Sequence, residues 1–306
     1  MSQMWAEIMQ QPDVIARALK ANATTLDRIR SRTPPRVRLI GHGTSGHAGA
    51  YGALVLENHW RCPCDLVAPP DRNGGAAIFG KGDLVIALSQ SGETPSIVAA
   101  AHRARRAGAE VVVVVNSAES DLAAAADHVL DCCAGPELAI PATKTFTAQV
   151  ALLLALAAGT SDASRVVAPM TELLSAPPAD VVQPSLVVGV ESGAPIAAEV
   201  ALKFAEAAGL GVRGLEAAEA LHGPISAGDG TVMLIGGRDS GNLAAIAAAR
   251  HAHWLDVVGR GLGSGVPEAD VLVCAVWGQV LAHNLALSLG RHPDHPTQLS
   301  KVTATL

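Results

Sequence analysis

The sequence predicts an α/β protein of two tandem domains, each a doubly wound, mainly parallel sheet of five strands flanked by helices. Three observations favour this fold class. The length of 306 residues suits two domains of roughly 150 residues. Hydrophobic residues make up 49% and aromatic residues 3%, as in parallel sheets covered by alanine-rich helices. Short β-branched runs also alternate with helical patterns, the order that right-handed crossovers produce.

The first half contains five predicted strands. The run 110–116, EVVVVVN, is continuous and β-branched, which is typical of a strand buried on both faces. The other strands are expected at 37–41, 65–68, 83–89 and 128–132. Helices are expected from about residue 46, over 95–107 and over 143–158.

A segment rich in Ser, Pro, Ala and Asp, 159–183, separates the two halves. We expect a first domain at 1–165, a linker at 166–183, a second domain at 184–290 and a tail at 291–306. Because the strand–helix pattern restarts after the linker, we expect two copies of one fold rather than a short repeat.

The second half contains four individually predicted strands and two predicted helices. The strands are expected at 185–190, 230–235, 253–258 and 270–276. The helices are expected at 194–208 and 278–289. The restarted pattern predicts a sheet like the first one.

Composition excludes several classes of function. The net charge is −6 and no run of five basic residues occurs, so nucleic acid is not an expected partner. The eleven histidines and five cysteines show no metal-ligand spacing, so neither a metal nor another cofactor is expected. The N-terminus lacks the apolar region of a signal peptide, and the Ala/Leu-rich stretch 148–159 is too short to span a bilayer. We expect a cytoplasmic protein without a membrane partner.

Two loops that follow predicted strands carry the clearest chemical signal, GHGTSG at 41–46 and SQSGETP at 89–95. Ligands bind at the carboxyl ends of strands in open parallel sheets. Neither loop matches a dinucleotide fingerprint or a P-loop. Thr94 and Pro95 alone would fit an ordinary helix start, but the run of hydroxyl and amide donors favours a phosphate. The candidate phosphate-binding side chains are those of Thr44, Ser45, Ser89, Gln90, Ser91 and Thr94.

The absence of Lys and Arg from both loops favours a small sugar phosphate over a triphosphate, which would need a lysine and magnesium. Further motifs follow in order along the chain. They are EIMQQP at 7–12, GTSGHA at 43–48, SQSGET at 89–94, AGPE at 134–137, TKTFTAQ at 143–149, EVALKFAE at 199–206, LHGP at 221–224 and PTQLSKVT at 296–303.

Together these motifs resemble the SIS (sugar isomerase) domain family over nearly the whole chain. The resemblance is to double-SIS proteins, namely the isomerase half of glutamine–fructose-6-phosphate amidotransferases and the stand-alone SIS-type glucosamine-6-phosphate deaminases. It implies two tandem SIS domains with flavodoxin-like sheets. It also implies that Ser45, the second loop, Glu137 and the position of Ala142 contact the sugar phosphate.

The resemblance implies four catalytic residues. Glu206 would move a proton between C1 and C2, and Lys203 would balance charge beside it. His222 would open the sugar ring and would reach the site from the neighbouring subunit of a homodimer. Lys301 would form a Schiff base with the open-chain ketose. Taken singly, these residues also fit a helix ion pair, a turn histidine and a solvated tail lysine.

The resemblance implies an amino-sugar-phosphate deaminase/isomerase that converts glucosamine 6-phosphate into fructose 6-phosphate and ammonia, or runs the ammonia-dependent reverse. The chain begins at the isomerase half, so we do not expect glutamine as the nitrogen source. Three features depart from the family: Ala142 in place of a serine, the turn 189–193 with Glu191 in place of a Gly-Arg-Gly pattern, and Thr297 in place of an arginine. These departures leave open another phosphosugar aldose–ketose isomerase, a fructosamine-6-phosphate deglycase or a non-catalytic phosphosugar-sensing module.

Overall fold

The computed structural model describes residues 2–68, 79–226, 230–236 and 240–296. They form two compact units. The first-sheet unit comprises the described residues of 14–136 and 148–164. The second-sheet unit comprises those of 1–13, 137–147 and 165–301. The domain and linker boundaries expected from composition stay a prediction.

The first-sheet unit contains a five-stranded parallel sheet in the order β2-β1-β3-β4-β5. This is the doubly wound order in which the chain reverses direction of travel between β1 and β3. All five predicted strands are confirmed. Their bounds are β1 Val37–Ile40, β2 Cys64–Leu66, β3 Leu84–Ser89, β4 Glu110–Val115 and β5 His128–Asp131.

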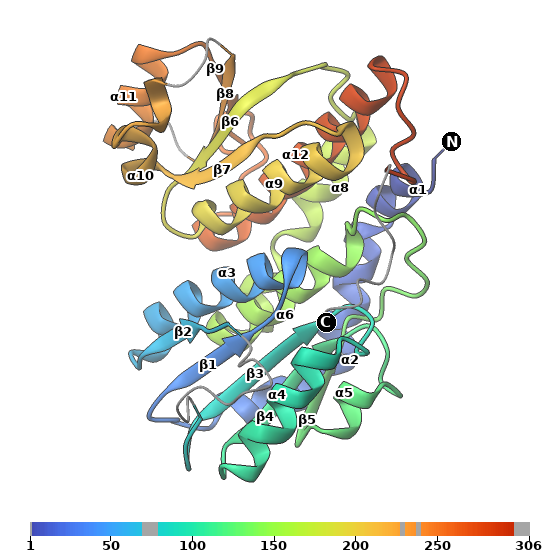
Figure 1. Ribbon diagram of the computed structural model, residues 1–306, viewed down its shortest axis with the longest axis vertical. Helices are drawn as coiled ribbons and strands as arrows, with labels where there is room; N and C mark the ends of the chain where they lie inside the picture. Colours follow the sequence, from blue (N-terminus) through green and yellow to red (C-terminus); the bar gives the residue numbers. More distant parts are fainter. Residues whose placement is uncertain (1, 69–78, 227–229, 237–239, 297–306) are drawn as a thin grey trace. The chain divides into compact units, whose positions relative to one another are not determined.

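Helices cover both faces of this sheet (Figure 1). The helix α4 (Pro95–Arg106) and the short α5 (Asp121–Ala124) pack on one face, in a core with Val85, Val111 and Val113. On the other face lie α3 (Gly43–Trp60) and α6 (Lys144–Ala158). The side chains of β3 are all buried, because a parallel strand covered on both faces has no solvent side.

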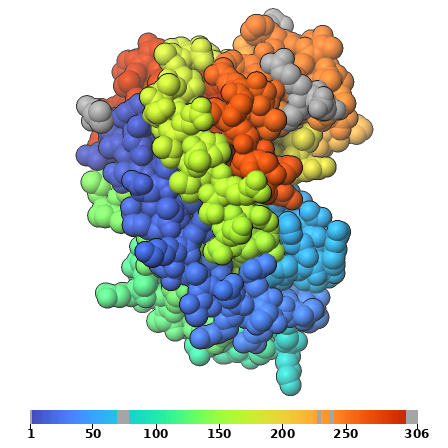
Figure 2. All heavy atoms as spheres, turned by 180° about the vertical axis from the view of Figure 1, so that it is seen from behind, coloured from blue at the N-terminus to red at the C-terminus, as the bar shows by residue number. Residues whose placement is uncertain are grey.

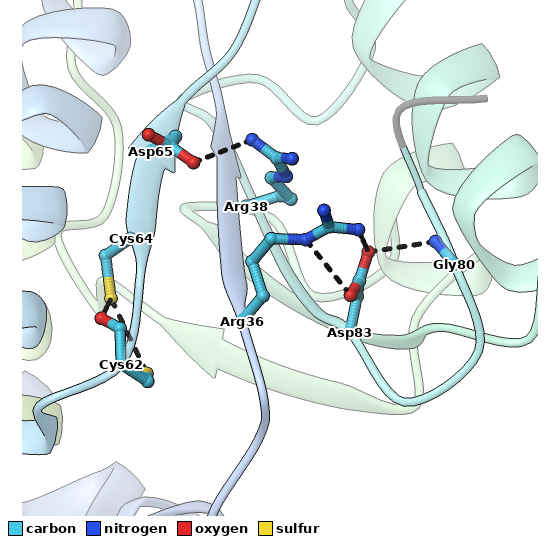
Figure 3. A network of polar contacts seen from close by, with 7 residues as sticks. All are labelled: Arg36, Arg38, Cys62, Cys64, Asp65, Gly80 and Asp83. Carbon is cyan, nitrogen blue, oxygen red and sulfur yellow. Dashed lines mark hydrogen bonds and ion pairs between the residues drawn. The ribbon is translucent and has the colours of Figure 1, made fainter. Parts of the chain in front are cut away.

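Ion pairs connect β1 to its two neighbours (Figure 3). The guanidinium of Arg36, just before β1, donates to both carboxylate oxygens of Asp83, at 3.2 and 2.6 Å. Asp83 also accepts from the amide of Gly80 at 2.9 Å. Arg38 in β1 pairs with Asp65 in β2 at 2.7 Å. These pairs link side chains on or beside three adjacent strands.

The second-sheet unit contains a parallel sheet in the order β7-β6-β8-β9. The structure describes four strands here, one fewer than the predicted five. Two helices, α9 (Gly193–Ala208) and α12 (Pro267–Ser288), lie on one face, and α10 (Ala217–Leu221) and α11 (Gly241–Ala249) lie on the other (Figure 1). The strands are β6 Pro184–Gly189, β7 Arg213–Glu216, β8 Thr231–Ile235 and β9 Ala252–Leu255.

The strand predicted at 270–276 is wrong, because these residues form the first half of α12. Pro267 lies in the first turn of that helix, and Glu268 and Asp270 place negative charge at its positive end. Nearly all of the helix is buried, so it lacks the polar face that distinguishes a helix from a buried strand in sequence. The helix predicted at 278–289 is the second half of the same element.

Four more α-helices and one 3-10 turn complete the described structure. They are α1 Gln3–Met9, α2 Gln11–Arg30, α7 Thr160–Ser164, α8 Val167–Ser175 and η1 Pro224–Ser226. In the described part of the chain, α12 alone is long and apolar enough to cross a membrane. Since 83% of its apolar window is buried inside the structure, α12 has the surroundings of a core helix.

Candidate functional site

The two candidate phosphate loops lie at the same end of the first sheet. They follow β1 and β3, which are adjacent, so both begin at the carboxyl ends of neighbouring strands at the point where the strand order reverses. His42 precedes α3 and Ser96 lies in the first turn of α4. The His42 Nε2 atom lies 3.0 Å from the Ser96 hydroxyl, so a side-chain hydrogen bond joins the two helix starts.

The second loop is held in a fixed turn by its own side chains. The hydroxyl of Ser89 accepts from the amide of Gly92 at 3.1 Å and lies 3.3 Å from the hydroxyl of Thr94. The hydroxyl of Ser91 accepts from the amide of Glu93 at 3.2 Å. This network places three hydroxyl groups of the predicted set on one turn.

Gly92 is required by the turn. Its φ is +71°, and a Cβ atom there would lie 2.1 Å from the hydroxyl oxygen of Ser120. The amide of Leu122 donates to the Gly92 carbonyl at 3.1 Å. No other residue type fits a left-handed conformation with so little space.

Neither α3 nor α4 is capped by the side chain of its N-cap residue. The backbone N–H groups of a first helical turn have no intrahelical acceptors and carry a partial positive charge. Thr44 and Gln90 are half-buried beside these helix ends. The arrangement can therefore bind an anion with backbone and hydroxyl donors and without a cationic side chain.

Ser45 is buried in the first turn of α3, and its hydroxyl accepts from the side-chain amide of Gln149 in α6 at 3.2 Å. The Oε1 atom of Gln149 is buried without a hydrogen-bond partner among the described residues. Gln149 belongs to the TKTFTAQ motif, but its contact with the loop depends on tertiary packing and could not be found from the sequence.

In the second-sheet unit, three ionisable side chains meet on α9. The ammonium of Lys203 lies 3.2 Å from a carboxylate oxygen of Glu199 and donates to Glu206. Lys203 and Glu199 are fully buried, whereas the side chain of Glu206 is 17% exposed. The carboxylate of Glu206 is therefore the member of the three that solvent reaches.

The charge state of Lys203 follows from this arrangement. Burial by itself lowers the pKa of Lys203, but Glu199 and Glu206 outweigh burial and raise its pKa above the ordinary value of 10.5. The lysine is a permanent cation that compensates two carboxylates.

His222 is the C-cap residue of α10 and is exposed. Glu216 begins the same helix, and its carboxylate accepts from the amides of Ala218 and Glu219 at 2.6 and 3.2 Å. An exposed imidazole is available to a second molecule, although the role in a partner subunit's site stays a prediction. Lys301 and Thr297 lie outside the described residues.

Glu137 is buried, and its carboxylate is occupied within the protein. It accepts from the amides of Thr143 and Thr145 at 3.0 and 3.1 Å, and from the hydroxyl of Thr145. These donors lie at the start of α6, so Glu137 caps that helix. Ala142 is half-buried in the same turn. Contact of either residue with a ligand stays a prediction.

No group of three His, Cys, Asp or Glu side chains in the described ranges is placed to hold a metal ion. The thiols of Cys62 and Cys64 lie 3.9 Å apart (Figure 3). Burial raises the pKa of the Cys64 thiol, and the neighbouring Cys62 raises it further. Cys64 is therefore a protonated and unreactive thiol.

Comparison with known proteins identifies the family of the first-sheet region. Residues 32–159 match the model of the SIS domain. The isomerizing glutamine–fructose-6-phosphate aminotransferase of Zymomonas mobilis is 28% identical, over 97% of this chain and 58% of the relative. The chain thus spans little more than half the length of such curated relatives.

Solved structures match over nearly the full chain. One, from Silicibacter pomeroyi and proposed to be a phosphosugar isomerase, is 26% identical with a TM-score of 0.82, covering 96% of this chain and 100% of that one. The glucosamine-6-phosphate deaminase of Thermotoga maritima shares the fold with a TM-score of 0.81 at 20% identity, covering 98% and 99% of the two chains. Residues 32–159 therefore match the SIS domain, and the chain is similar to part of the isomerizing glutamine–fructose-6-phosphate aminotransferases.

Proposed function

We propose that the chain is an isomerase-type enzyme that acts on a phosphosugar, and that it interconverts glucosamine 6-phosphate with fructose 6-phosphate and ammonia. The observation that carries this proposal is the pair of hydroxyl-lined loops at two uncapped helix starts, where β1 and β3 end. Such a site suits the dianion of a small phosphate ester. The SIS domain match at 32–159 covers both loops.

We propose that Ser45, Ser89, Ser91 and Thr94 hold the phosphate, with Thr44 and Gln90 at the edge. Glu137 and Ala142 would lie on the sugar side of the ligand. Glu137 would act by shaping the start of α6, because its carboxylate is already hydrogen-bonded there.

Glu206 is the proposed proton carrier. Aldose–ketose interconversion removes a proton from C2 and delivers one to C1, and a single carboxylate on one face of the sugar can do both. The partial exposure of Glu206 leaves its carboxylate accessible. The fully buried Lys203 compensates its charge and that of Glu199.

Release of ammonia follows from the same proton transfer. Loss of the C2 proton and protonation at C1 convert the 2-amino aldose into a 2-imino compound. Water adds to the C=N bond, and the C–N bond then breaks to give ammonia and the ketose. The balance is glucosamine 6-phosphate plus water giving fructose 6-phosphate plus ammonia, with no redox partner.

The remaining assignments rest on the family resemblance. His222 would open the sugar ring as an acid near neutral pH, from the partner subunit of a homodimer. Lys301 would form a Schiff base with the ketose. The second-sheet unit would be a second SIS domain, a proposal supported by its strand order β7-β6-β8-β9, which repeats the first four positions of the first sheet. The enzyme would act in the cytoplasm.

The test is an assay of both products from glucosamine 6-phosphate, ammonia and fructose 6-phosphate. Wild type should form them in equal amounts, and Glu206→Gln should lower the rate by at least ~100-fold. Ser89→Ala should mainly raise KM. Glu172→Gln, which changes an exposed glutamate on α8, is the matched control.

Other outcomes separate the alternatives. Isomerisation of a phosphosugar without ammonia would replace the deaminase by an aldose–ketose isomerase, and release of an amino acid from a fructosamine 6-phosphate would indicate a deglycase. Binding without turnover of any phosphosugar would contradict catalysis and leave a sensing module.

A further inference from the structure

A pocket opens at the edge of the second sheet, and its described lining contains none of the residues assigned above. β9 pairs with β8, and no other described strand lies on its far side. The pocket has a volume of about 550 Å³, within the range of small-molecule sites. The segment after β9, orange in Figure 2, reaches the surface. The lining residues are Ala252, His253, Trp254, Asp256, Gly259 and Arg260.

Arg260 is held in place without a counter-ion. Its guanidinium carbon lies 4.1 Å from the ring centre of Trp277, which is fully buried in α12. In the part of the chain that the structure describes, no hydrogen bond or ion pair engages Arg260. Stacking uses the flat face of a guanidinium, so the N–H donors at its edge stay available to an oxyanion.

His253 offers a second unused polar atom. Its Nε2 atom is buried and has no hydrogen-bond partner among the described residues. Its ring lies edge-on to Trp277, with centres 6.5 Å apart. His253 lines the pocket, and buried polar atoms are nearly always hydrogen-bonded in native proteins, so this nitrogen is a donor or acceptor that the described residues leave unsatisfied.

The charges around His253 are mixed. Burial lowers the pKa of His253, Asp180 raises it, and Arg260 and His251 lower it further. The ring is therefore neutral at neutral pH, and an anion bound beside it would favour the protonated form. Asp256 also lines the pocket. One of its carboxylate oxygens accepts from the Gly259 amide at 2.8 Å, and this hydrogen bond shapes the loop after β9.

We propose that this pocket binds a small molecule that carries an oxyanion, a phosphate or a carboxylate, through Arg260 and His253. Trp254 would contact the rest of the ligand. The site belongs to the second-sheet unit and uses none of the residues of the proposed reaction. It is therefore an additional ligand site whose existence does not depend on the proposed function.

The test follows the histidine ring resonances of the full chain by NMR while inorganic phosphate or sodium acetate is added at constant ionic strength. The His253 resonance is assigned with the variant His253→Gln. Its chemical shift should change and then reach a plateau as at least one of the two anions is added, and the anion that gives a plateau identifies the oxyanion. Affinity should rise as pH falls, because the bound anion raises the pKa of His253.

Arg260→Gln should weaken this binding by ~10-fold or more, since a charge-assisted hydrogen bond is lost. Arg213→Gln, an exposed arginine in β7, is the matched control and should bind like wild type. Ser89→Ala should also leave the His253 titration unchanged, which separates this site from the phosphate loops. A His253 resonance that shifts in neither arm, or equal affinity in Arg260→Gln, would overturn the proposal.

Discussion

Lys203→Met removes the cation from a fully buried charge cluster and should be strongly destabilising. The Lys203 ammonium lies 3.2 Å from Glu199, and both side chains have almost no exposure. At an effective dielectric constant of about 20, two unit charges at this distance attract by about 5 kcal/mol. Removing one partner of such a pair typically costs about 3–5 kcal/mol, which is a large part of the stability of an ordinary domain.

Urea unfolding followed by tryptophan fluorescence measures this difference in the free energy of unfolding. The double variant Lys203→Met/Glu199→Gln should recover part of the loss, because the uncompensated carboxylate is gone. Lys20→Met, at an exposed position of α2, is the control. A loss below about 1 kcal/mol, or a double variant that recovers none of the loss, would refute the reasoning.

Three further changes test other parts of the structure. Gly92→Ala should cost about 1–3 kcal/mol and weaken phosphosugar binding, because its Cβ would meet Ser120. Asp294→Asn should cost about 1–2 kcal/mol, since this carboxylate accepts from two amides at the start of α1, at 2.8 and 2.7 Å. His283→Gln should make the free energy of unfolding less sensitive to a fall in pH below 6.5. Burial lowers the pKa of His283, so the unfolded chain takes up a proton at a higher pH than the folded chain, and acid destabilises the wild type.

Each of these changes has a matched control, read by the same unfolding experiment. Gly211→Ala meets no atom within 4 Å, Asp27→Asn changes an exposed carboxylate, and His102→Gln changes an exposed imidazole. If a control variant loses as much stability as its partner, the contact assigned to that partner does not account for the effect.

The strands β3 and β4 could be predicted from sequence because LVIALS and EVVVVV are nearly continuous apolar runs between turn residues. β7 could not, since Arg213–Glu216 contains a glycine and two charged residues. It lies in the sheet because Gly214 lets α9 pass closely, where a Cβ atom would lie 2.3 Å from the Cα of Ala198. The strand prediction at 270–276 failed for the opposite reason, an excess of apolar residues in a buried helix.

In the candidate site, too, one part could be predicted from sequence and another could not. The hydroxyl-rich loops are local in sequence, so their residue types and spacing predict them directly. The occupied carboxylate of Glu137 and the hydrogen bond from Gln149 to Ser45 depend on residues distant in the chain or on burial. The spacing of Glu199 and Lys203 allows an ion pair, but only the fold shows that both charges are excluded from water.

Transfer of hydrogen between C1 and C2 by Glu206 is the central claim, and deuterium exchange tests it most directly. Wild type in D2O should introduce solvent deuterium into fructose 6-phosphate at C1, followed by NMR. Glu206→Gln should slow that exchange by at least ~100-fold while the sugar phosphate still binds. Exchange or turnover in the variant at close to the wild-type rate would contradict the account.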